Sequence, residues 1–207
     1  MPFEGFASQD FDTMAIEGLE PRMDALIATV RPKLNALGEE TAPFLSALCG
    51  EEMYPHVAKH ARRTVHPPND TWVAWGPSKR GYKALPHFQT GMFSTHLFAV
   101  FAIIYESPNK IAFADALADN MDMVRKELPG NYFWSTDHLD LRGTMHRDMG
   151  RVQFEELIRR LKEVKKAEVT CGLRIERNDP VLGDGAALLQ LVESTFEKLL
   201  PLYRMSF

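Results

Sequence analysis

The chain has 207 residues, of which 45% are hydrophobic and 25% charged, the composition of an ordinary soluble globular protein. No apolar run approaches the ~20 residues of a membrane-spanning helix, and the first residues lack the basic and apolar regions of an export signal. Two cysteines provide neither a disulfide framework nor a metal motif. We therefore expect a single domain over residues 1–207, located in the cytoplasm and without membrane contact.

The first fifty residues are predicted to be helical, because apolar residues recur at helical spacing between Met23 and Leu37. Pro32 lies inside this pattern and should kink or break the helix, since it has no backbone N–H. A second helical segment is predicted to follow Thr41. It should end at Gly50, because glycine favours the left-handed conformation found at helix ends.

The middle of the chain is predicted to form strands, because it is rich in β-branched and aromatic residues separated by turn sequences. No helix separates these strands, so they should be antiparallel neighbours in one sheet. The four predicted strands cover residues 54–61, 71–75, 85–93 and 95–106.

Beyond residue 106 the pattern returns to helices alternating with short strands. A helix over 108–127 should begin at Pro108, since proline suits the first helical position. A final amphipathic helix is predicted over 185–203. The remaining elements are strands at 131–136 and 167–176 and a helix around 154–161. These elements predict an α+β fold, in which helices pack on the apolar face of a largely antiparallel sheet.

Charge is unevenly distributed along the chain, whose net charge is −4. Residues 54–83 hold six Lys or Arg against a single acid, a balance of +5, so the remainder carries −9. Such asymmetry favours an anionic partner at one place on the surface, although a solvated basic face is the commoner cause.

The basic, histidine-containing segment at residues 56–87 therefore predicts a site for a small phosphate-bearing anion, because arginine recognises phosphate by paired hydrogen bonds. If the first two strands pair, Arg62 or Arg63 comes close to the loop that holds Asn69 and Asp70. The alternative is a structural turn in which Asp70 caps backbone amides and pairs with an arginine. The candidate ligand-binding residues are Arg62, Arg63, Lys79, Arg80, Lys83, His60, Asn69 and His87.

Two other functions fit the same segment. One is a hydrolase or transferase that uses His87 or His60 as a general base. The other is a basic docking surface for nucleic acid or a protein partner. Trp72 and Trp75 lie among the cations, as in proteins that stack bases, but they fall on opposite faces of a strand. A pI near 6.0 also disfavours nucleic acid.

Metal and cofactor signatures are missing from the sequence. His56 and His60 have the spacing of a helical metal pair, but on a strand they stand about 13 Å apart, too far for one ion. Nearby acids, such as Asp137 with Asp140 and Asp179 with Asp184, are interpreted as caps of turns and helices. We predict no metal site and no cofactor.

Several segments together resemble the YktB-like proteins, a family of unknown function found chiefly in Gram-positive bacteria. The resemblance extends over almost the whole chain and is most specific around residues 56–75. It implies a compact α+β domain of cytoplasmic type, and it implies no reaction, substrate or catalytic residue. The segments that carry it read DFDTMAIEGLEPRM, HVAKHARRTVHPPNDTWVAW, KRGYKALPHFQ, ESPNK, NDPVLGDGAALLQ and LLPLY.

Overall fold

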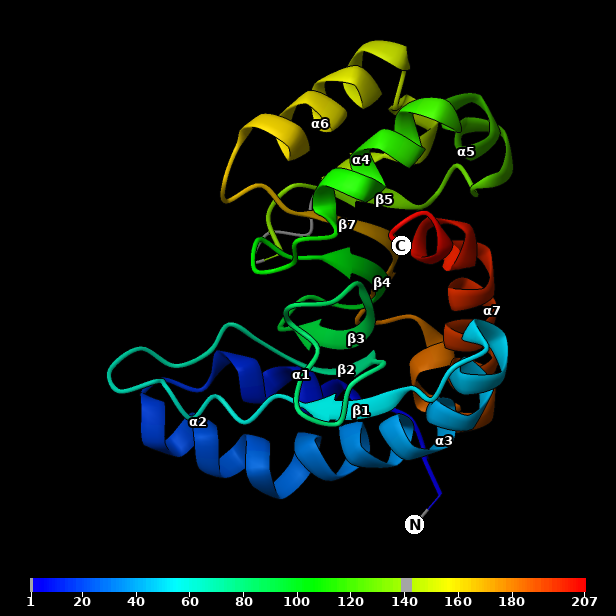
Figure 1. The fold of residues 1–207 in the computed structure, drawn as a ribbon. Coiled ribbons are helices and arrows are strands. Elements are labelled where there is room, and N and C mark those ends of the chain that lie inside the picture. The colour runs from blue at the N-terminus through cyan, green and yellow to red at the C-terminus, as the bar shows by residue number, and fades with distance from the viewer. Residues whose placement is uncertain (1, 139–142) are drawn as a thin grey trace.

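The computed structural model describes residues 2–138 and 143–207, which are built around one seven-stranded sheet (Figure 1). Every strand pairs with its neighbours in the antiparallel sense, in the order β1-β2-β3-β4-β7-β5-β6. The α+β class is therefore confirmed, and so is the prediction that the first four strands are consecutive neighbours. The strands are β1 Tyr54–Val57, β2 Asp70–Gly76, β3 His87–Phe93, β4 His96–Ile103, β5 Phe133–Ser135, β6 Thr144–Met145 and β7 Val169–Glu176.

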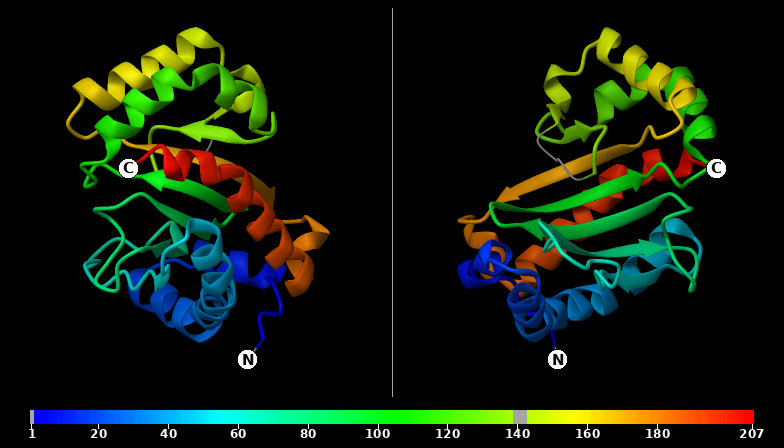
Figure 2. Two further views of the ribbon diagram at one scale, coloured as in Figure 1. Left: turned by 45° about the vertical axis from the view of Figure 1, so that its right-hand side comes forward. Right: turned by 90° about the vertical axis from the view of Figure 1, so that its left-hand side faces the viewer.

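Helices lie on one side of this sheet and beyond its two edges (Figure 2). The α-helices are α1 Ser8–Asp12, α2 Leu19–Ala25, α3 Arg31–Cys49, α4 Lys110–Asp119, α5 Met121–Glu127, α6 Arg151–Glu163 and α7 Gly185–Arg204. Within the described residues, three short 3₁₀ turns occur at Thr13–Ala15, His146–Asp148 and Pro180–Gly183.

The expected break at Pro32 is wrong. Residues 19–49 are continuously helical, because a π-helical turn over Leu26–Val30 joins α2 to α3. Pro32 lies two residues after this π-helical turn, where the regular hydrogen-bond pattern of the α-helix is already interrupted. The predicted second helix is the C-terminal part of α3, which ends as expected at Gly50 in the left-handed conformation.

The helix predicted over 108–127 is two helices, α4 and α5. The first begins at Lys110 after Asn109, two residues later than predicted. The side chain of Asn120 donates to the carbonyl of Ala116 and ends the first helix, so the second starts at Met121. Asparagine side chains compete with the helical backbone in this way.

The core lies between the sheet and the helices. Trp75 of β2 is fully buried and donates from Nε1 to the carbonyl of Gly38 in α3, at 2.9 Å. Phe196 of α7 packs against the rings of Trp75 and Phe88, at centroid distances of 5.5 and 4.9 Å. At the other end of the same face, Phe113 of α4 meets Phe101 of β4. The helices therefore cover one face of the sheet.

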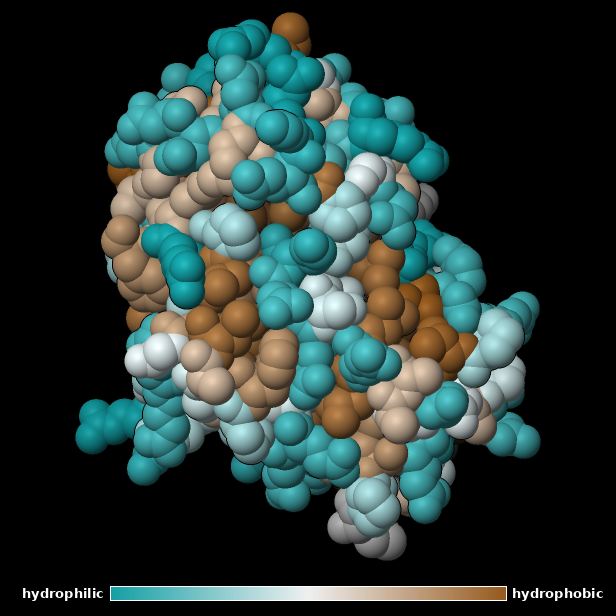
Figure 3. Space-filling model, turned by 90° about the vertical axis from the view of Figure 1, so that its right-hand side faces the viewer, coloured by the Kyte–Doolittle hydropathy of each residue, from teal (hydrophilic) through white to brown (hydrophobic). Residues whose placement is uncertain are grey.

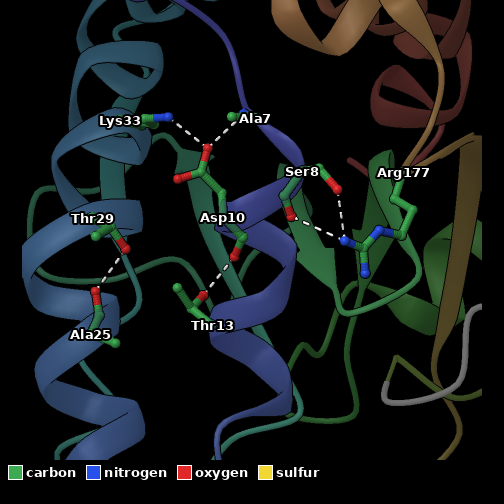
Figure 4. A network of polar contacts seen from close by, with 8 residues as sticks. All are labelled: Ala7, Ser8, Asp10, Thr13, Ala25, Thr29, Lys33 and Arg177. Carbon is green, nitrogen blue, oxygen red and sulfur yellow. Dashed lines mark hydrogen bonds and ion pairs between the residues drawn. The ribbon is translucent and has the colours of Figure 1, made fainter.

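Polar contacts attach the N-terminal segment to the rest of the fold (Figure 4). The buried carboxylate of Asp10 accepts from the backbone N of Ala7 at 2.7 Å and from Lys33 of α3 at 2.5 Å. Arg177, just past β7, donates to Ser8 in α1. Segments far apart in sequence are thus joined at both sides of α1.

The outer side of α7 is mixed in character. Figure 3 shows apolar atoms there in separate patches between hydrophilic side chains. Three half-buried leucines of α7 pack against the core, namely Leu189, Leu191 and Leu200. None of the helices in the described ranges is long and apolar enough to cross a membrane.

Candidate functional site

The opposite face of the sheet carries no helix among the described residues (Figure 2, right). Because side chains alternate along a strand, the pairing register places Asp70 and Trp72 of β2, and His87 and Gln89 of β3, on this helix-free face. Its centre is a second apolar cluster of Phe98, Val100 and Phe133, with Trp72, Phe93 and Met145 packed against it. The face is therefore buried although no helix covers it.

Aromatic and histidine side chains form a chain of contacts across one end of this face. Nε1 of Trp72 donates to the hydroxyl of Tyr82 at 2.7 Å. The Tyr82 ring in turn lies 4.7 Å from the ring of His87 and 5.6 Å from that of His56. As predicted, the two tryptophans of β2 face opposite ways, with Trp75 in the main core.

His87 is one of the predicted site residues, and its hydrogen bonds leave it no free nitrogen. Nδ1 lies 2.7 Å from the carbonyl of Leu85 and must carry the proton, so Nε2 accepts from the amide of Gln89 at 2.9 Å. Complete burial lowers the pKa of His87 to about 4. His87 is thus a neutral, fully bonded ring, which does not suit a general base.

His60 occupies the loop between β1 and β2, and it is the one non-glycine residue with positive φ (52°) in the described ranges. Its Nε2 lies 3.2 Å from the hydroxyl of Thr71, and its ring packs edge-on against Trp72 at 5.4 Å. Burial, together with the charges of Arg63 and Arg31, lowers the pKa of His60 to about 4.

The predicted cations belong to two loops rather than one cluster. Arg62 and Arg63 are exposed in the loop after β1, which Asn69 ends. Lys79, Arg80 and Lys83 are exposed in the loop after β2, where Lys79 lies over the ring of Tyr54 at 5.2 Å.

The pairing of β1 with β2 does bring one arginine toward Asp70, as expected. Asp70 begins β2, is only 4% exposed, and forms no ion pair with any residue in the described ranges. Burial raises the pKa of Asp70 to about 6, while the positive charges of His138 and Arg63 act against that rise. The carboxylate therefore lies within electrostatic reach of both cations.

His138 and Glu168 form the pair that sequence reasoning missed. Oε1 of Glu168 accepts from Nδ1 of His138 at 2.7 Å and from the backbone N of His138 at 2.9 Å. The hydrogen bond to Glu168 raises the pKa of His138 despite burial, and the charges of Glu168, Asp70 and Asp137 add to the rise. Burial raises the pKa of Glu168, but its bonds to His138 outweigh burial, so the net shift is downward.

Nothing in the local sequence marks this pair. His138 follows β5 and Glu168 precedes β7, and the two meet because β5 and β7 are sheet neighbours. The sequence does predict strands at 131–136 and 167–176, but it does not show that these two strands are neighbours in the sheet. Asp140, one of the acids weighed in the sequence, lies outside the described residues.

The same residues belong to a group of side chains with the composition of a metal site. Single ligand atoms of Asp137, His138 and Glu168 lie within 4.8 Å of one another. The bonds from His138 already satisfy Oε1 of Glu168, so this part of the group is stable without an ion. Oε2 of Glu168 and the hydroxyl of Thr170, two residues along the same face, are buried and find no hydrogen-bond partner in the part of the chain that the structure describes.

A cavity of about 560 Å³ lies between α6 and the β5–β6 hairpin, and its wall includes neither His138 nor Glu168. Its walls combine apolar side chains such as Trp134, Met149 and Leu157 with the charged Asp137 and Arg160. Cavities of this volume hold small organic ligands. Asp137 belongs both to its wall and to the group around Glu168.

The fold and the site define an α+β protein whose sheet has one helix-covered face and one face of buried polar groups. The chain belongs to the DUF1054 family, described as a domain of unknown function, which matches residues 6–203. This confirms the resemblance to the YktB-like proteins. The chain is 50% identical to a UPF0637 protein of Bacillus velezensis over 201 residues, 97% of this chain and 96% of the relative.

Two further relatives cover nearly the whole chain. A UPF0637 protein of Bacillus licheniformis is 46% identical over 97% of this chain and 95% of its own length. One of Bacillus cereus is 42% identical over 99% of both chains. The similarity therefore includes both loops with the predicted cations and both strands that position His138 and Glu168.

Proposed function

We propose that this protein binds a small anionic, phosphate-bearing ligand at the rim of the helix-free face. The site is the basic cluster, which we define as Arg31, Lys59, His60, Arg62 and Arg63. One observation carries the proposal: the charges of Arg31 and Arg63 both act on the ring of His60, yet neither arginine has an ion-pair partner among the described residues.

Some cations in the described residues have counterions, whereas this cluster has none, and neither have Lys79, Arg80 and Lys83 in the loop after β2. Lys33 pairs with Asp10 at 2.5 Å, and Arg159 pairs with Glu156 at 2.6 Å. Arg31 instead donates to a backbone carbonyl, that of Lys59, at 3.3 Å. Neighbouring like charges repel one another, and a bound anion would relieve that repulsion.

The backbone of His60 adds to this support. A left-handed conformation costs a non-glycine residue roughly 1–2 kcal/mol, and such strain is concentrated at ligand sites. Here it is held by the contacts of His60 with Thr71 and Trp72. The amide of Arg63 donates to the carbonyl of His60 at 3.0 Å, which closes the turn and places the two side chains on one short segment.

The experiment is a thermal-shift titration with orthophosphate, pyrophosphate and a nucleoside triphosphate at low and high salt. Ligand at a hundredfold excess over Kd stabilises by about 2.7 kcal/mol, roughly 5–10 °C for a domain of this size. Arg62→Ala and Arg63→Ala should remove most of that shift. The matched controls are Lys79→Ala and Arg80→Ala, which remove the same charge from the loop after β2. These two variants should keep the thermal shift.

Three results would contradict the proposal. If no anion stabilises the protein, the basic cluster is a solvated face without a ligand. If all four variants lose the thermal shift equally, the site extends over both loops, as the sequence alone predicts. Stabilisation by a single-stranded oligonucleotide only, with the steep salt dependence of phosphate contacts, would assign the surface to nucleic acid.

A further inference from the structure

We propose that Asp137, His138 and Glu168 bind one divalent transition-metal ion of the zinc type. We call these three residues the strand-end group. Each of them offers one ligand atom, and the three atoms all lie within 4.8 Å of one another. The group shares no residue with the basic cluster. Metal binding therefore goes beyond the proposed anion binding, and the two are tested separately.

The sheet brings the strand-end group together. β5 and β7 are antiparallel neighbours, and Ser135 is paired with Thr170. Continuing this register by two residues places Asp137, just after β5, opposite Glu168, just before β7. His138 is the next residue, and Glu168 accepts from its ring and its backbone N–H at 2.7 and 2.9 Å. The ligand atoms are thus positioned by the ends of two strands, which is the rigid support that a metal site requires.

Glu168 has acceptor capacity that its protein contacts leave unused. The residue is 6% exposed, and both bonds from His138 end on Oε1. Oε2 is buried and accepts no hydrogen bond from the residues that the structure describes. The backbone N–H of Tyr105 lies near this carboxylate but forms no hydrogen bond to Oε2. A buried carboxylate oxygen without a donor costs free energy, and a coordinated cation offsets that cost.

The charges of the strand-end group match those of a divalent ion. Two carboxylates and a neutral imidazole together carry two negative charges, and carboxylates opposed on neighbouring strands repel each other. Because a carboxylate only accepts, the proton between Nδ1 of His138 and Oε1 of Glu168 is carried by the ring. An ion takes the place of that proton, which leaves to solvent. The buried carboxylate therefore has a positive partner in both states.

The donor set selects the ion. An imidazole nitrogen with carboxylate oxygens suits Zn²⁺ and related transition metals, whereas Mg²⁺ and Ca²⁺ prefer shells made of oxygen. Ligand atoms of tetrahedral zinc lie ~3.4 Å apart, so the widest pair here has to close by at most about 1.4 Å. Asp137 is the exposed member and can make this movement without repacking the core. It also has other interactions, with which the ion must compete.

The experiment is isothermal titration calorimetry of the full chain, stripped of metal with EDTA and dialysed into a chloride buffer. We expect zinc and cobalt(II) chloride to bind at one ion per chain, and magnesium and calcium chloride not to bind. Asp137→Asn, His138→Gln and Glu168→Gln should each weaken zinc binding at least about tenfold, because each removes a ligand.

Controls separate the strand-end group from weak binding at the surface. Asp119→Asn on α4 and His66→Gln in the loop after β1 remove an exposed acid and an exposed histidine, and both should keep the zinc affinity. Zinc should shift the ring resonances of His138 in NMR spectra but not those of His87, whose nitrogens are both bonded. Asp137→Asn keeps the size of an exposed side chain, so its melting temperature should not change while its zinc affinity falls.

The other outcomes would overturn the metal site. These are no binding of zinc or cobalt(II), or magnesium binding as tightly as zinc. Zinc binding that survives both Asp137→Asn and His138→Gln, or that His66→Gln removes, would show an adventitious ion only. Arg63→Ala should keep zinc binding, and orthophosphate should stabilise the metal-free protein. Failure of the metal site and failure of the anion site are therefore seen independently.

Discussion

Glu168 holds His138 through two hydrogen bonds to a single carboxylate oxygen, at 2.7 and 2.9 Å, across thirty residues of sequence. One bond comes from the ring and the other from the backbone, so both the side chain and the chain path after β5 depend on this acid. The other carboxylate oxygen is buried and has no hydrogen-bond partner among residues 2–138 and 143–207.

The histidines should titrate in two classes. Burial lowers the pKa of His60 and His87 to about 4, whereas the bond to Glu168 raises that of His138 above 6.5. Ring resonances followed by NMR from pH 4 to 9 should show only His138 of these three changing above pH 6.5. In Glu168→Gln its midpoint should fall. A midpoint near 6.5 for His87 would show that its bonds to Leu85 and Gln89 do not persist in solution.

Asp70 should make the protein less stable as pH rises. Its pKa is about 6 in the folded protein and about 3.8 when unfolded, so the folded state binds more protons between these values. The free energy of unfolding should therefore fall from pH 4 to pH 6, by about 3 kcal/mol from this residue.

The measurement for Asp70 is urea denaturation of the protein and of Asp70→Asn at several pH values. The asparagine variant should be relatively more stable at pH 7 than at pH 4, by up to the same amount. Identical pH slopes for the two proteins would show that Asp70 is not perturbed by burial.

Asp10 should contribute more to the free energy of unfolding than its exposed neighbour Asp12. Asp10→Ala removes the acceptor of Ala7 N–H and the partner of Lys33 (Figure 4), at a cost of about 1–3 kcal/mol. Asp12 pairs with Arg177 at the surface, so Asp12→Ala should cost below about 1 kcal/mol. Chemical denaturation of both variants is the test, and equal costs would refute the ranking.

Two glycines should respond differently to alanine. A Cβ on Gly172 of β7 would lie 2.1 Å from the carbonyl oxygen of Ala99 on β4, so Gly172→Ala should disrupt the sheet and cost several kcal/mol. A Cβ on Gly50 meets nothing within 4 Å, but φ is +78°, so Gly50→Ala should cost about 1 kcal/mol. Melting temperatures that fall equally would contradict the assigned register of β4 and β7.

Much of the fold is readable from local pattern. Strands β1 to β4 and the last helix, α7, lie close to their predicted positions, because alternation and helical spacing record which side chains are buried. Boundaries were less predictable. The first strand ends at Val57 rather than 61, and α4 ends at Asp119, because hydrogen bonds formed in the folded chain decide where an element stops.

The sequence by itself determined the α+β class, the neighbouring strands β1 to β4, and the concentration of cations between residues 54 and 83. Only the tertiary structure decided which charges meet. It brought His138 to Glu168 through the pairing of β5 with β7. The physical reason is that the periodicity of apolar residues shows which side of a helix or strand is buried. It does not show which distant strand will supply the neighbouring side chain.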